Sequence, residues 1–367
     1  MRKSNLLIAF IGLAYGLTAQ DTDRKINFPD VEGYKSLKCD LHIHTVFSDG
    51  SVWPNIRVEE AVRDGLDAIA LTEHIEYQPH KDDIPHPDRN RSYHLALEAA
   101  KPHDLLVIHG TEITRSMPPG HANALFVKDV NAIKKEDAMD AYKAARAQGA
   151  YIFWNHPDWI RQQKDALPVL SDFHKQLIAN DLLHGIEVVN DLSMSEAALQ
   201  LAVDHNLTAM GTSDIHGLVD YEFEVANGGH RPICLVFAKE KTEEAIKEAL
   251  FAGRTVAWFR QTLLGKKENM KALLDACLKT KIKGYEGDTS ILEIELRNNS
   301  DAAFILENTS VYDFRQHGKI IEVEPQSKIL IQVVTARGNI DTQPLTFKVL
   351  NAIINHKEFA EISIDLK

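Results

Sequence analysis

The sequence predicts an α/β protein in which a parallel sheet closes into a barrel, followed by a small C-terminal antiparallel β-sandwich. Short apolar runs alternate with amphipathic segments from about residue 36 to residue 260, which is typical of βαβ units. Six or more such repeats favour a barrel, whose chemistry lies at the carboxyl ends of its strands. From about residue 288 to residue 367 short strands follow one another without helices, which indicates a sandwich.

The length and charge of the chain limit the class of protein. Its 367 residues suit one large and one small domain, and 44% hydrophobic with 26% charged residues is ordinary globular composition. The net charge of −12 argues against an extended nucleic-acid surface, which needs a basic stripe. A small anionic substrate stays possible because bound divalent cations reverse the local field. The three cysteines are widely spaced, so we expect small core residues rather than a disulfide framework.

Residues 1–19 have the features of a signal peptide. A basic start of Arg2 and Lys3 precedes an apolar run over 6–14 and a small-residue exit at 17–19. The run is short for a membrane span, although an uncleaved anchor is an alternative. We therefore expect an exported protein, periplasmic or secreted, with no stable membrane insertion after the leader is removed.

Residues 20–260 are predicted to form the barrel. The expected strands are the apolar runs 38–43, 67–71, 105–112, 122–127, 150–154, 185–189, 207–211 and 233–238. The expected helices are the amphipathic segments 54–64, 91–101, 134–148, 170–180, 193–205 and 241–250. Because a helix between two strands lets them run parallel, the side chains after each apolar run are the candidates for chemistry.

The remainder of the chain carries fewer reactive residues. Residues 261–287 are rich in lysine and helical in pattern, so we expect a helical linker. Residues 288–367 contain alternating segments at 291–296, 328–334 and 345–350, which predict strands of the sandwich domain. Few histidines and no clustered acid–base residues lie there, so we expect a packing or partner module.

The segment 39–50, Cys-Asp-Leu-His-Ile-His-Thr-Val-Phe-Ser-Asp-Gly, is the first candidate site. His42 and His44 are two residues apart, which places both imidazoles on one face of a strand. Asp49 follows in a turn and is close enough in sequence to reach back over the strand end. Two histidines and a carboxylate at a strand-to-loop junction suit a divalent cation.

Five further places supply residues of metal-ligand type at the expected strand ends. They contain His74, Glu112, His121, His156, and the pair Asp214 and His216. Taken singly, each has an ordinary explanation as a helix cap, a turn residue or a buried hydrogen-bonded carboxylate. Taken together, nine nitrogen and oxygen ligands without a thiolate fit two or three divalent ions, whether zinc, manganese or iron. A carboxylate such as Glu112 suits the bridge between two ions about 3.5–4 Å apart.

These segments together resemble a known family. The stretches DLHIHTVFSDG, TEH, GTEI, GHANALF, NHP and SDIH occur in this order between about residues 36 and 260. This set is similar to the PHP (polymerase and histidinol phosphatase) superfamily of metal-dependent phosphoesterases. The resemblance implies a distorted (β/α)7 barrel of TIM-like type that holds up to three ions, and it does not extend to the leader or the C-terminal segment.

The resemblance also implies a place for each ligand. One ion would be held by His42, His44 and Asp214. A second ion, joined to the first through Glu112, would be held by His121 and His156. A third ion would be held by Asp49, His74 and His216. Some members of the family have a histidine where this chain has Asp49, and a harder oxygen ligand weakens that ion or shifts its identity toward manganese or iron.

The expected reaction is hydrolysis of a small phosphate ester by a hydroxide that bridges the ions. Two ions lower the pKa of a shared water toward about 7 and neutralise charge on the phosphoryl group. The candidate catalytic residues are Glu112, Asp214 and His230, of which His230 would protonate the leaving group. The candidate substrate-binding residues are Lys81, Arg115 and Arg231, with Arg89 and Arg91 as alternatives to Lys81; Arg115 is equally explained as a solvated loop residue.

Two other functions are compatible with the sequence. The same metal chemistry would serve an amide or lactone hydrolase, because a bridging hydroxide also attacks carbonyl groups. Cationic groups at the mouth of the site favour phosphate, whereas a mouth without lysine and arginine favours a carbonyl substrate. A non-catalytic exported binding protein with a degenerate barrel is the third possibility, and low metal content would favour it.

Overall fold

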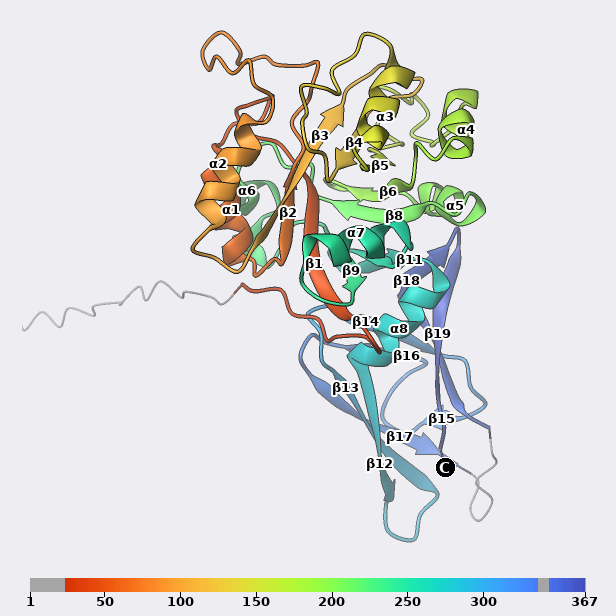
Figure 1. The fold of residues 1–367 in the computed structure, drawn as a ribbon. Coiled ribbons are helices and arrows are strands. Elements are labelled where there is room, and N and C mark those ends of the chain that lie inside the picture. Colours follow the sequence, from red (N-terminus) through yellow and green to blue (C-terminus); the bar gives the residue numbers. More distant parts are fainter. Residues whose placement is uncertain (1–23, 336–342, 367) are drawn as a thin grey trace, which may run out of the picture.

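The computed structural model describes residues 24–335 and 343–366. The signal peptide expected over residues 1–19 lies outside these residues. Figure 1 shows a larger α/β unit at one end of the molecule and a smaller β unit at the other. In the described part of the chain, no helix has both the length and the apolar character that a membrane span requires.

The strands of the larger unit follow the expected apolar runs closely. They are β1 (Lys35–Ile43), β2 (Ala68–Leu71), β3 (Leu106–Ile113), β4 (Ala122–Leu125), β5 (Tyr151–Trp154), β6 (Gly185–Asn190), β8 (Thr208–Thr212) and β9 (Ile233–Ala238). Short strand β7 (Ser193–Met194) and strands β10 (Thr255–Phe259) and β11 (Thr262–Gly265) extend the sheet. Strands β2, β5 and β9 are buried along their whole length, which explains why they are continuous apolar runs rather than alternating ones.

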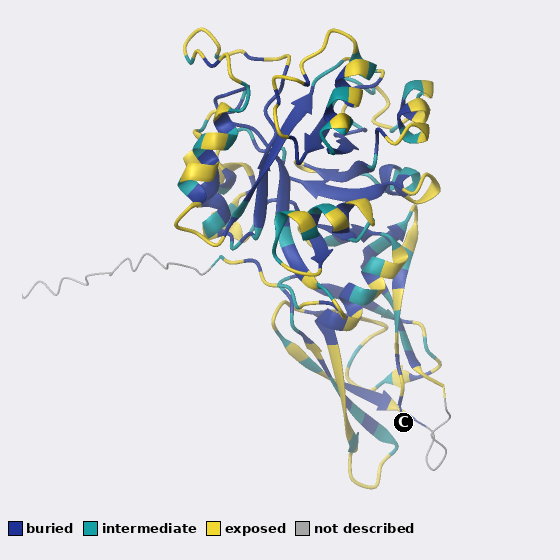
Figure 2. Ribbon diagram, in the orientation of Figure 1, coloured by how far each residue is buried: buried dark blue, intermediate teal, exposed yellow. Residues whose placement is uncertain are grey.

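Helices lie outside the strands, also near the predicted positions. They are α1 (Pro54–Arg63), α2 (Arg91–Ala100), α3 (Ala138–Ala147), α4 (Asp172–Ala179), α5 (Glu196–Asp204), α6 (Val219–Glu222), the 3-10 turn η1 (Val225–Asn227), α7 (Glu243–Phe251) and α8 (Lys267–Cys277). The side chains of Asp137, Ser171 and Thr242 cap α3, α4 and α7 by accepting a backbone N–H of the first turn. Figure 2 shows buried strands surrounded by helices whose outer faces are exposed.

The sheet of the larger unit is mixed rather than wholly parallel. Strands β1, β2 and β3 are parallel, as are β5, β6 and β8. Strand β4 is antiparallel to both β3 and β5, and β9 is antiparallel to β1. The expectation of a parallel sheet is therefore wrong for β4 and β9. For β4 the reason is local, because residues 114–121 between β3 and β4 contain no helix that could return the chain to the other end of the sheet.

The ends of β1 and β8 meet at one end of the sheet. The N–H of Asp214 donates to the carbonyl of His42 at 2.9 Å, and the N–H of His44 donates to the carbonyl of Ile215 at 3.1 Å. These bonds lie past the last residue of β8, whereas no ladder between β1 and β8 is found in the described sheet. A mixed α/β sheet is thus observed, and the distorted (β/α)7 barrel stays a prediction.

The segment 261–287 differs from the expected helical linker. Helix α8 occupies its centre, but β11 precedes it and strand β12 (Leu278–Tyr285) follows it directly. Strand β12 pairs with the next strand from Leu278 to Tyr285, so its conformation is fixed by a partner rather than by its own lysine-rich pattern. The expectation of a purely helical linker is therefore wrong on both sides of α8.

The smaller unit confirms an antiparallel β module at the C-terminus. Its further strands are β13 (Ile291–Asn298), β14 (Phe304–Asn308), β15 (Asp313–Phe314), β16 (Ile320–Val323), β17 (Lys328–Val334), β18 (Leu345–Asn355) and β19 (Glu358–Ile364). Strands β12, β13, β17 and β15 form a separate four-stranded sheet, while β18 joins the large sheet through β11. Apolar side chains of the smaller unit, including Ile294, Phe304 and Phe347, belong to the same core as those of the larger unit.

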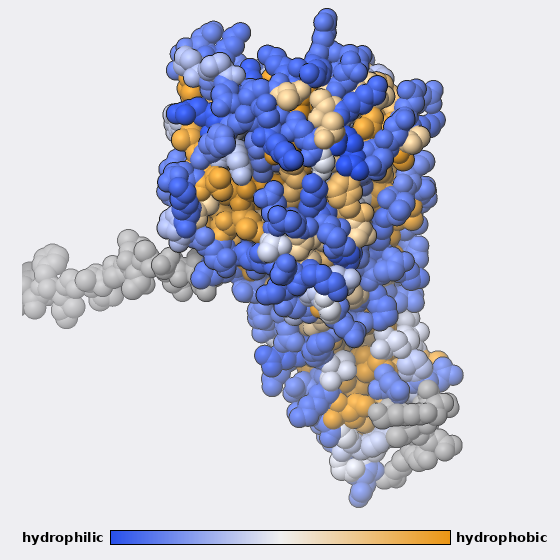
Figure 3. Space-filling model, viewed as in Figure 1, coloured by the Kyte–Doolittle hydropathy of each residue, from blue (hydrophilic) through white to orange (hydrophobic). Residues whose placement is uncertain are grey.

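The surface and the cysteines agree with a globular protein. Figure 3 shows a mostly hydrophilic face on which apolar side chains gather in small patches. Cys39, Cys234 and Cys277 are buried free thiols, as expected for small core residues. The core therefore forms by ordinary burial of apolar groups and needs no covalent cross-link among the described residues.

Candidate metal centre

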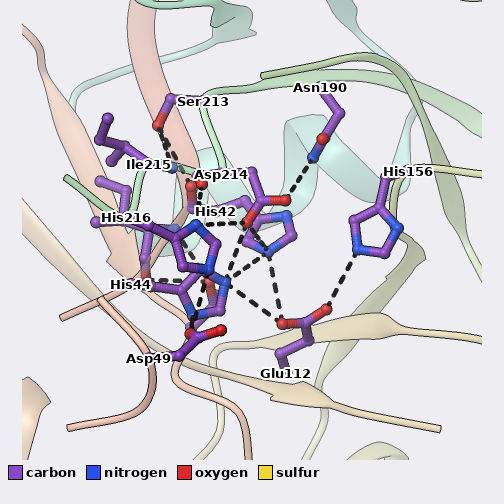
Figure 4. A network of polar contacts seen from close by, with 12 residues as sticks. His42, His44, Asp49, Glu112, His156, Asn190, Ser213, Asp214, Ile215 and His216 are labelled. Atoms are coloured by element: carbon purple, nitrogen blue, oxygen red, sulfur yellow. Dashed lines mark hydrogen bonds and ion pairs between the residues drawn. The ribbon is translucent and has the colours of Figure 1, made fainter. Parts of the chain in front are cut away.

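The nine predicted ligands come from separate elements and converge at one place, beside the joined ends of β1 and β8. His42 belongs to the end of β1 and His44 follows directly after it, Glu112 belongs to β3, and Asp214 and His216 lie in the segment after β8. Asp49, His74, His121 and His156 lie in loops at the same edge. Figure 4 shows the side chains of His42, His44, Asp49, Glu112, Asp214 and His216 pointing towards one another, with His156 facing Glu112. The sequence therefore identified a genuine cluster.

The first group of ligands is buried and compact. The Nε2 atoms of His42 and His44 lie 3.0 Å apart, and Oδ1 of Asp214 lies 3.0 Å from the first and 3.1 Å from the second. These three atoms lie within 4.8 Å of one another, as atoms that share one cation must. Asp214 reaches this position with a φ of 50°, a backbone conformation that non-glycine residues adopt infrequently.

Glu112 lies at the centre of the cluster and faces several histidines. Its Oε2 atom is 3.4 Å from Nε2 of His44 and 2.6 Å from Nδ1 of His74. Its Oε1 atom is 2.8 Å from Nδ1 of His121 and 3.7 Å from Nε2 of His156. The two carboxylate oxygens therefore face opposite parts of the cluster, as a bridge between two ions requires.

The third group surrounds Asp49. Its Oδ1 atom is 3.8 Å from Nδ1 of His44, 3.4 Å from Nε2 of His74 and 3.2 Å from Nε2 of His216. The structure thus brings together the residues that the resemblance places on a third ion. It also shows overlap between the groups, because His44 contacts Asp49 as well as Asp214, and His74 contacts Glu112 as well as Asp49.

Unsatisfied buried atoms show that the donor set fits metal ions. Among the described residues, Oδ1 of Asp49, Oε2 of Glu112 and Nδ1 of His121 are buried without a well-formed hydrogen bond. They approach neighbouring ligand atoms closely but not in hydrogen-bonding alignment. Burial of such atoms is costly unless something compensates it. A divalent cation bound between them would supply that compensation.

The electrostatics of the cluster also favour a cation. Burial lowers the pKa of His44 to about 3, so its imidazole is neutral and can act as a ligand at neutral pH. Burial also opposes protonation of His74, but Glu112 and Asp49 outweigh it and raise the pKa of His74 to about 10. Although burial opposes its ionisation, the pKa of Glu112 lies well below its usual value because His74 and His121 stabilise the carboxylate. The site therefore attracts positive charge, which a metal ion would provide in place of protons.

Glu187 is a residue of the site that the sequence reading missed. Its buried carboxylate accepts hydrogen bonds from Nδ1 of His42 at 2.7 Å and from the hydroxyl of Thr212 at 2.6 Å. Its other oxygen accepts from the backbone N–H of His156 at 2.6 Å and from the amide of Asn190 at 2.8 Å. A carboxylate behind a histidine fixes which ring nitrogen faces the metal. The signal was present, because Glu187 is a charge within the apolar run 185–189.

Arg57 and Glu73 support the site from behind. The guanidinium of Arg57 is fully buried and donates to the carbonyls of His44, Ile215 and His216 at 2.9, 3.2 and 2.9 Å. Glu73 accepts hydrogen bonds from the turn that carries Asp49, through residues 45 and 48. Arg57 does not stand out in the sequence, because it acts through backbone carbonyls that only folding brings together. Glu73 lies within the TEH stretch, but the sequence does not show that it holds this turn.

A cavity of about 560 Å³ opens from the ligand cluster to the surface. Its inner end includes Asp49, His74, His121, His156 and Asp214. The outer lining includes Asp158, Trp159, Ile160, Asp191, Leu192 and Glu222. Among the described residues, no lysine or arginine lines this cavity.

The predicted cationic contacts therefore lie elsewhere. Lys81 is exposed in the loop before α2 and does not line the cavity. Arg115 donates to the carbonyls of residues 135 and 136, pairs with Glu76 at 2.9 Å, and lines a separate groove. Arg89 and Arg91, the alternatives to Lys81, are also absent from the cavity lining. Prolines and polar residues in the loop before α2 predict that the loop is exposed, but they do not predict the direction in which it projects.

His230 is half-buried against the sheet and Arg231 is fully buried in the fold. The ring of His230 stacks on Trp258 with centroids 3.6 Å apart, and Nδ1 of His230 donates to a backbone carbonyl at 2.8 Å. The buried guanidinium of Arg231 pairs with Asp40 at 3.2 Å and with Asp64 at 2.8 Å. Neither residue lines the cavity, so the predictions of a proton donor and a phosphate contact are wrong.

Comparison with known families agrees with this geometry. The model of the PHP domain matches residues 40–314, which is most of the chain. The chain belongs to the PHP domain family. A second model, described as an Ig-like domain, matches residues 278–365, beginning where β12 begins. The PHP match and the Ig-like match overlap over residues 278–314, and the strand pairing assigns that overlap to the C-terminal β unit.

Solved structures include one similar protein with both parts. It is a two-domain protein of Bacteroides vulgatus, described as containing a predicted PHP-like metal-dependent phosphoesterase, with 39% identity and a TM-score of 0.87. The match covers 93% of this chain and 98% of that one. PsfC of Pseudomonas syringae has 18% identity and a TM-score of 0.43, with coverage of 61% and 91%. A protein of Bifidobacterium adolescentis, proposed to be a metal-dependent phosphoesterase, has 19% identity and a TM-score of 0.39, with coverage of 49% and 88%. The search of curated proteins finds no match.

Proposed function

We propose that this PHP-family protein is a hydrolase that uses two or three divalent ions to cleave a small phosphate ester. One observation carries the proposal: the ligand set forms overlapping groups around Glu112 at the closed end of a cavity. The Bacteroides vulgatus protein supports the same class through its predicted phosphoesterase domain. The nitrogen and oxygen donors suit zinc, manganese or iron.

The residues of the cluster would hold the ions in the groups described above. Bound divalent ions lower the pKa of a coordinated water toward about 7 and neutralise charge on phosphoryl oxygens. Glu112 and Asp214 would serve the reaction as ligands, the first between two groups and the second beside His42 and His44. Glu187 would keep the proton of His42 on Nδ1, so that Nε2 remains available to a metal ion.

A second candidate function is hydrolysis of an amide or a lactone. The cavity lining favours it in one respect, because the described lining contains no lysine or arginine that would bind a phosphate directly. In that case the ions would polarise a carbonyl group instead of a phosphoryl group. An experiment must therefore decide whether the substrate is a phosphate ester or an amide or lactone.

Metal analysis combined with substrate tests would examine both candidates. We expect at least two ions per chain and hydrolysis of an aryl phosphomonoester or phosphodiester in preference to an aryl lactone or an anilide. His42→Ala and Glu112→Ala should each abolish hydrolysis and reduce the metal content. Lys81→Ala is the control, because its exposed side chain lies outside the cavity. Activity that survives both ligand substitutions would refute the proposal, and a preference for the lactone or anilide would support the second candidate.

We also propose that the protein is exported. The proposal is based on the basic start, apolar run and small-residue exit within residues 1–19. Expression of the full chain in a bacterial host should give a mature protein outside the cytoplasm that begins near residue 20. Retention of an intact N-terminus in the cytoplasm would contradict it.

A further inference from the structure

The cavity is electrostatically asymmetric. At its inner end the ligand carboxylates Asp49, Glu112 and Asp214 bring three negative charges, which two divalent ions already outweigh. At its outer end Asp158, Asp191 and Glu222 add negative charge, and the described lining contains no lysine or arginine. Bound divalent ions would therefore offset the negative charge at the closed end, whereas the mouth would stay negative.

Two of the outer carboxylates have no lysine or arginine partner among the described residues. Glu222 is occupied, because its Oε1 atom accepts the backbone N–H of Gly217 at 2.7 Å. Among the described residues, Asp158 and Asp191 form no ion pair with any lysine or arginine. Asp191 is exposed and has a φ of 50°, a backbone strain that is often found where a residue serves a site.

The wall between these carboxylates is apolar. The exposed fractions of Trp159, Ile160 and Leu192 are 37, 67 and 50%, which is high for large apolar side chains. All three side chains line the cavity, so they form an exposed apolar surface within its mouth. The guanidinium of Arg161 lies 5.8 Å from the ring centroid of Trp159, but Arg161 lines the neighbouring groove and not this cavity.

We propose that the mouth of the cavity selects substrates whose leaving group combines an apolar body with an ammonium group, and that Asp158 and Asp191 determine this selectivity. The inference rests on the proposed function, because it assumes that the phosphate ester group binds to the ions at the closed end of the cavity. An apolar body would bury the side chains of Trp159, Ile160 and Leu192. A cation beyond it would meet Asp158 and Asp191, whereas a second anionic group would be repelled by them.

A matched series of substrates tests the proposal. The three compounds are 4-(aminomethyl)phenyl, 4-(hydroxymethyl)phenyl and 4-(carboxymethyl)phenyl phosphate, whose methylene spacer keeps the leaving groups similar. The metal-loaded enzyme should show the highest kcat/KM for the ammonium compound and the lowest for the carboxylate compound. Two carboxylates in a partly hydrated mouth should separate these extremes by about tenfold or more, and added salt should reduce the difference.

Substitutions assign the effect to the two carboxylates. The double variant Asp158→Asn with Asp191→Asn should reduce the ratio between the ammonium and carboxylate compounds to within about twofold. The control Asp104→Asn changes a side chain that is 95% exposed and lies outside the cavity, so it should keep the wild-type ratio. Equal kcat/KM values for all three compounds in the wild type would overturn the proposal while leaving phosphate-ester hydrolysis intact.

A binding measurement covers the case in which none of the esters is hydrolysed. Calorimetry with the metal-loaded protein would compare 4-(aminomethyl)benzylphosphonate with 4-(carboxymethyl)benzylphosphonate. Tighter binding of the ammonium compound, lost in the double variant, would support the selectivity even if the proposed reaction failed. Equal affinities, a preference for the carboxylate or no binding of either compound would overturn it.

Discussion

Replacing Glu187 with glutamine should prevent His42 from binding a metal ion, although it only exchanges one carboxylate oxygen for an NH2 group. All four groups around the carboxylate are hydrogen-bond donors: Nδ1 of His42, the hydroxyl of Thr212, the N–H of His156 and the amide of Asn190. A carboxylate accepts from all of them, whereas a glutamine amide must place its own NH2 group against one pair. The backbone N–H of His156 cannot turn, so the NH2 group is expected to face His42 and Thr212.

The consequence for His42 is a change of tautomer. To accept a hydrogen bond at Nδ1, its ring must carry the proton on Nε2, the atom that lies 3.0 Å from both His44 and Asp214. A protonated Nε2 cannot bind a metal ion. Loss of a carboxylate behind a ligand histidine typically lowers metal affinity by about 10–100-fold, which corresponds to about 1.4–2.7 kcal/mol.

Competition with a chromogenic chelator would measure this loss directly. Thr212→Val is the matched control, because it removes a neighbouring hydrogen bond to Glu187 and leaves the carboxylate with His42. That variant should unfold more readily, by about 1 kcal/mol, yet keep its metal affinity within about twofold. The reasoning fails if Glu187→Gln binds metal as tightly as the wild type, or if both variants lose affinity equally.

Three further predictions concern stability. Arg231→Met should destabilise the fold by about 3–5 kcal/mol, because it leaves the buried carboxylate of Asp40 without its cation and Asp64 with Arg24 alone. A raised KM with unchanged urea unfolding would instead restore Arg231 as a substrate contact. Burial lowers the pKa of His174 to about 4, below its unfolded value, so the unfolded chain binds more protons and stability falls as the pH drops below about 6.5. The part of this loss that is due to His174 should be about 2 kcal/mol at pH 5 relative to pH 7, measured as the difference between the wild type and His174→Gln in urea unfolding of metal-free protein. An equal pH dependence in both proteins would refute it. Removal of the ions with a chelator should lower the Tm and abolish hydrolysis, both restored by added metal; an unchanged Tm would indicate that the ligand cluster forms without ions.

Much of the fold is readable from the sequence because buried strands and amphipathic helices have distinct periodicities. The apolar runs at 67–71 and 150–154 became β2 and β5 almost residue for residue. Strand direction was harder to predict from the sequence, since β4 runs antiparallel because of the short connection between β3 and β4. Strand β12 was missed because its conformation comes from pairing with β13 rather than from apolar alternation.

The candidate ligands were also readable, since metal binding restricts the side-chain types to a few and parallel strands deliver their ends to one edge. His42, Glu112 and Asp214 meet although they are far apart in the chain. The substrate contacts were not readable in this way. Arg231 and His230 have the chemistry of a phosphate site, but Arg231 is buried and the ring of His230 stacks on Trp258.

The sequence by itself therefore determined which residues could bind ions and which segments would carry them. The tertiary structure alone decided the direction of each side chain, the support that Glu187 gives to His42, and the absence of lysine and arginine from the described cavity lining. The physical reason is that a ligand type is a local chemical property, whereas orientation and charge at a cavity mouth are set by packing between segments that are distant in the chain.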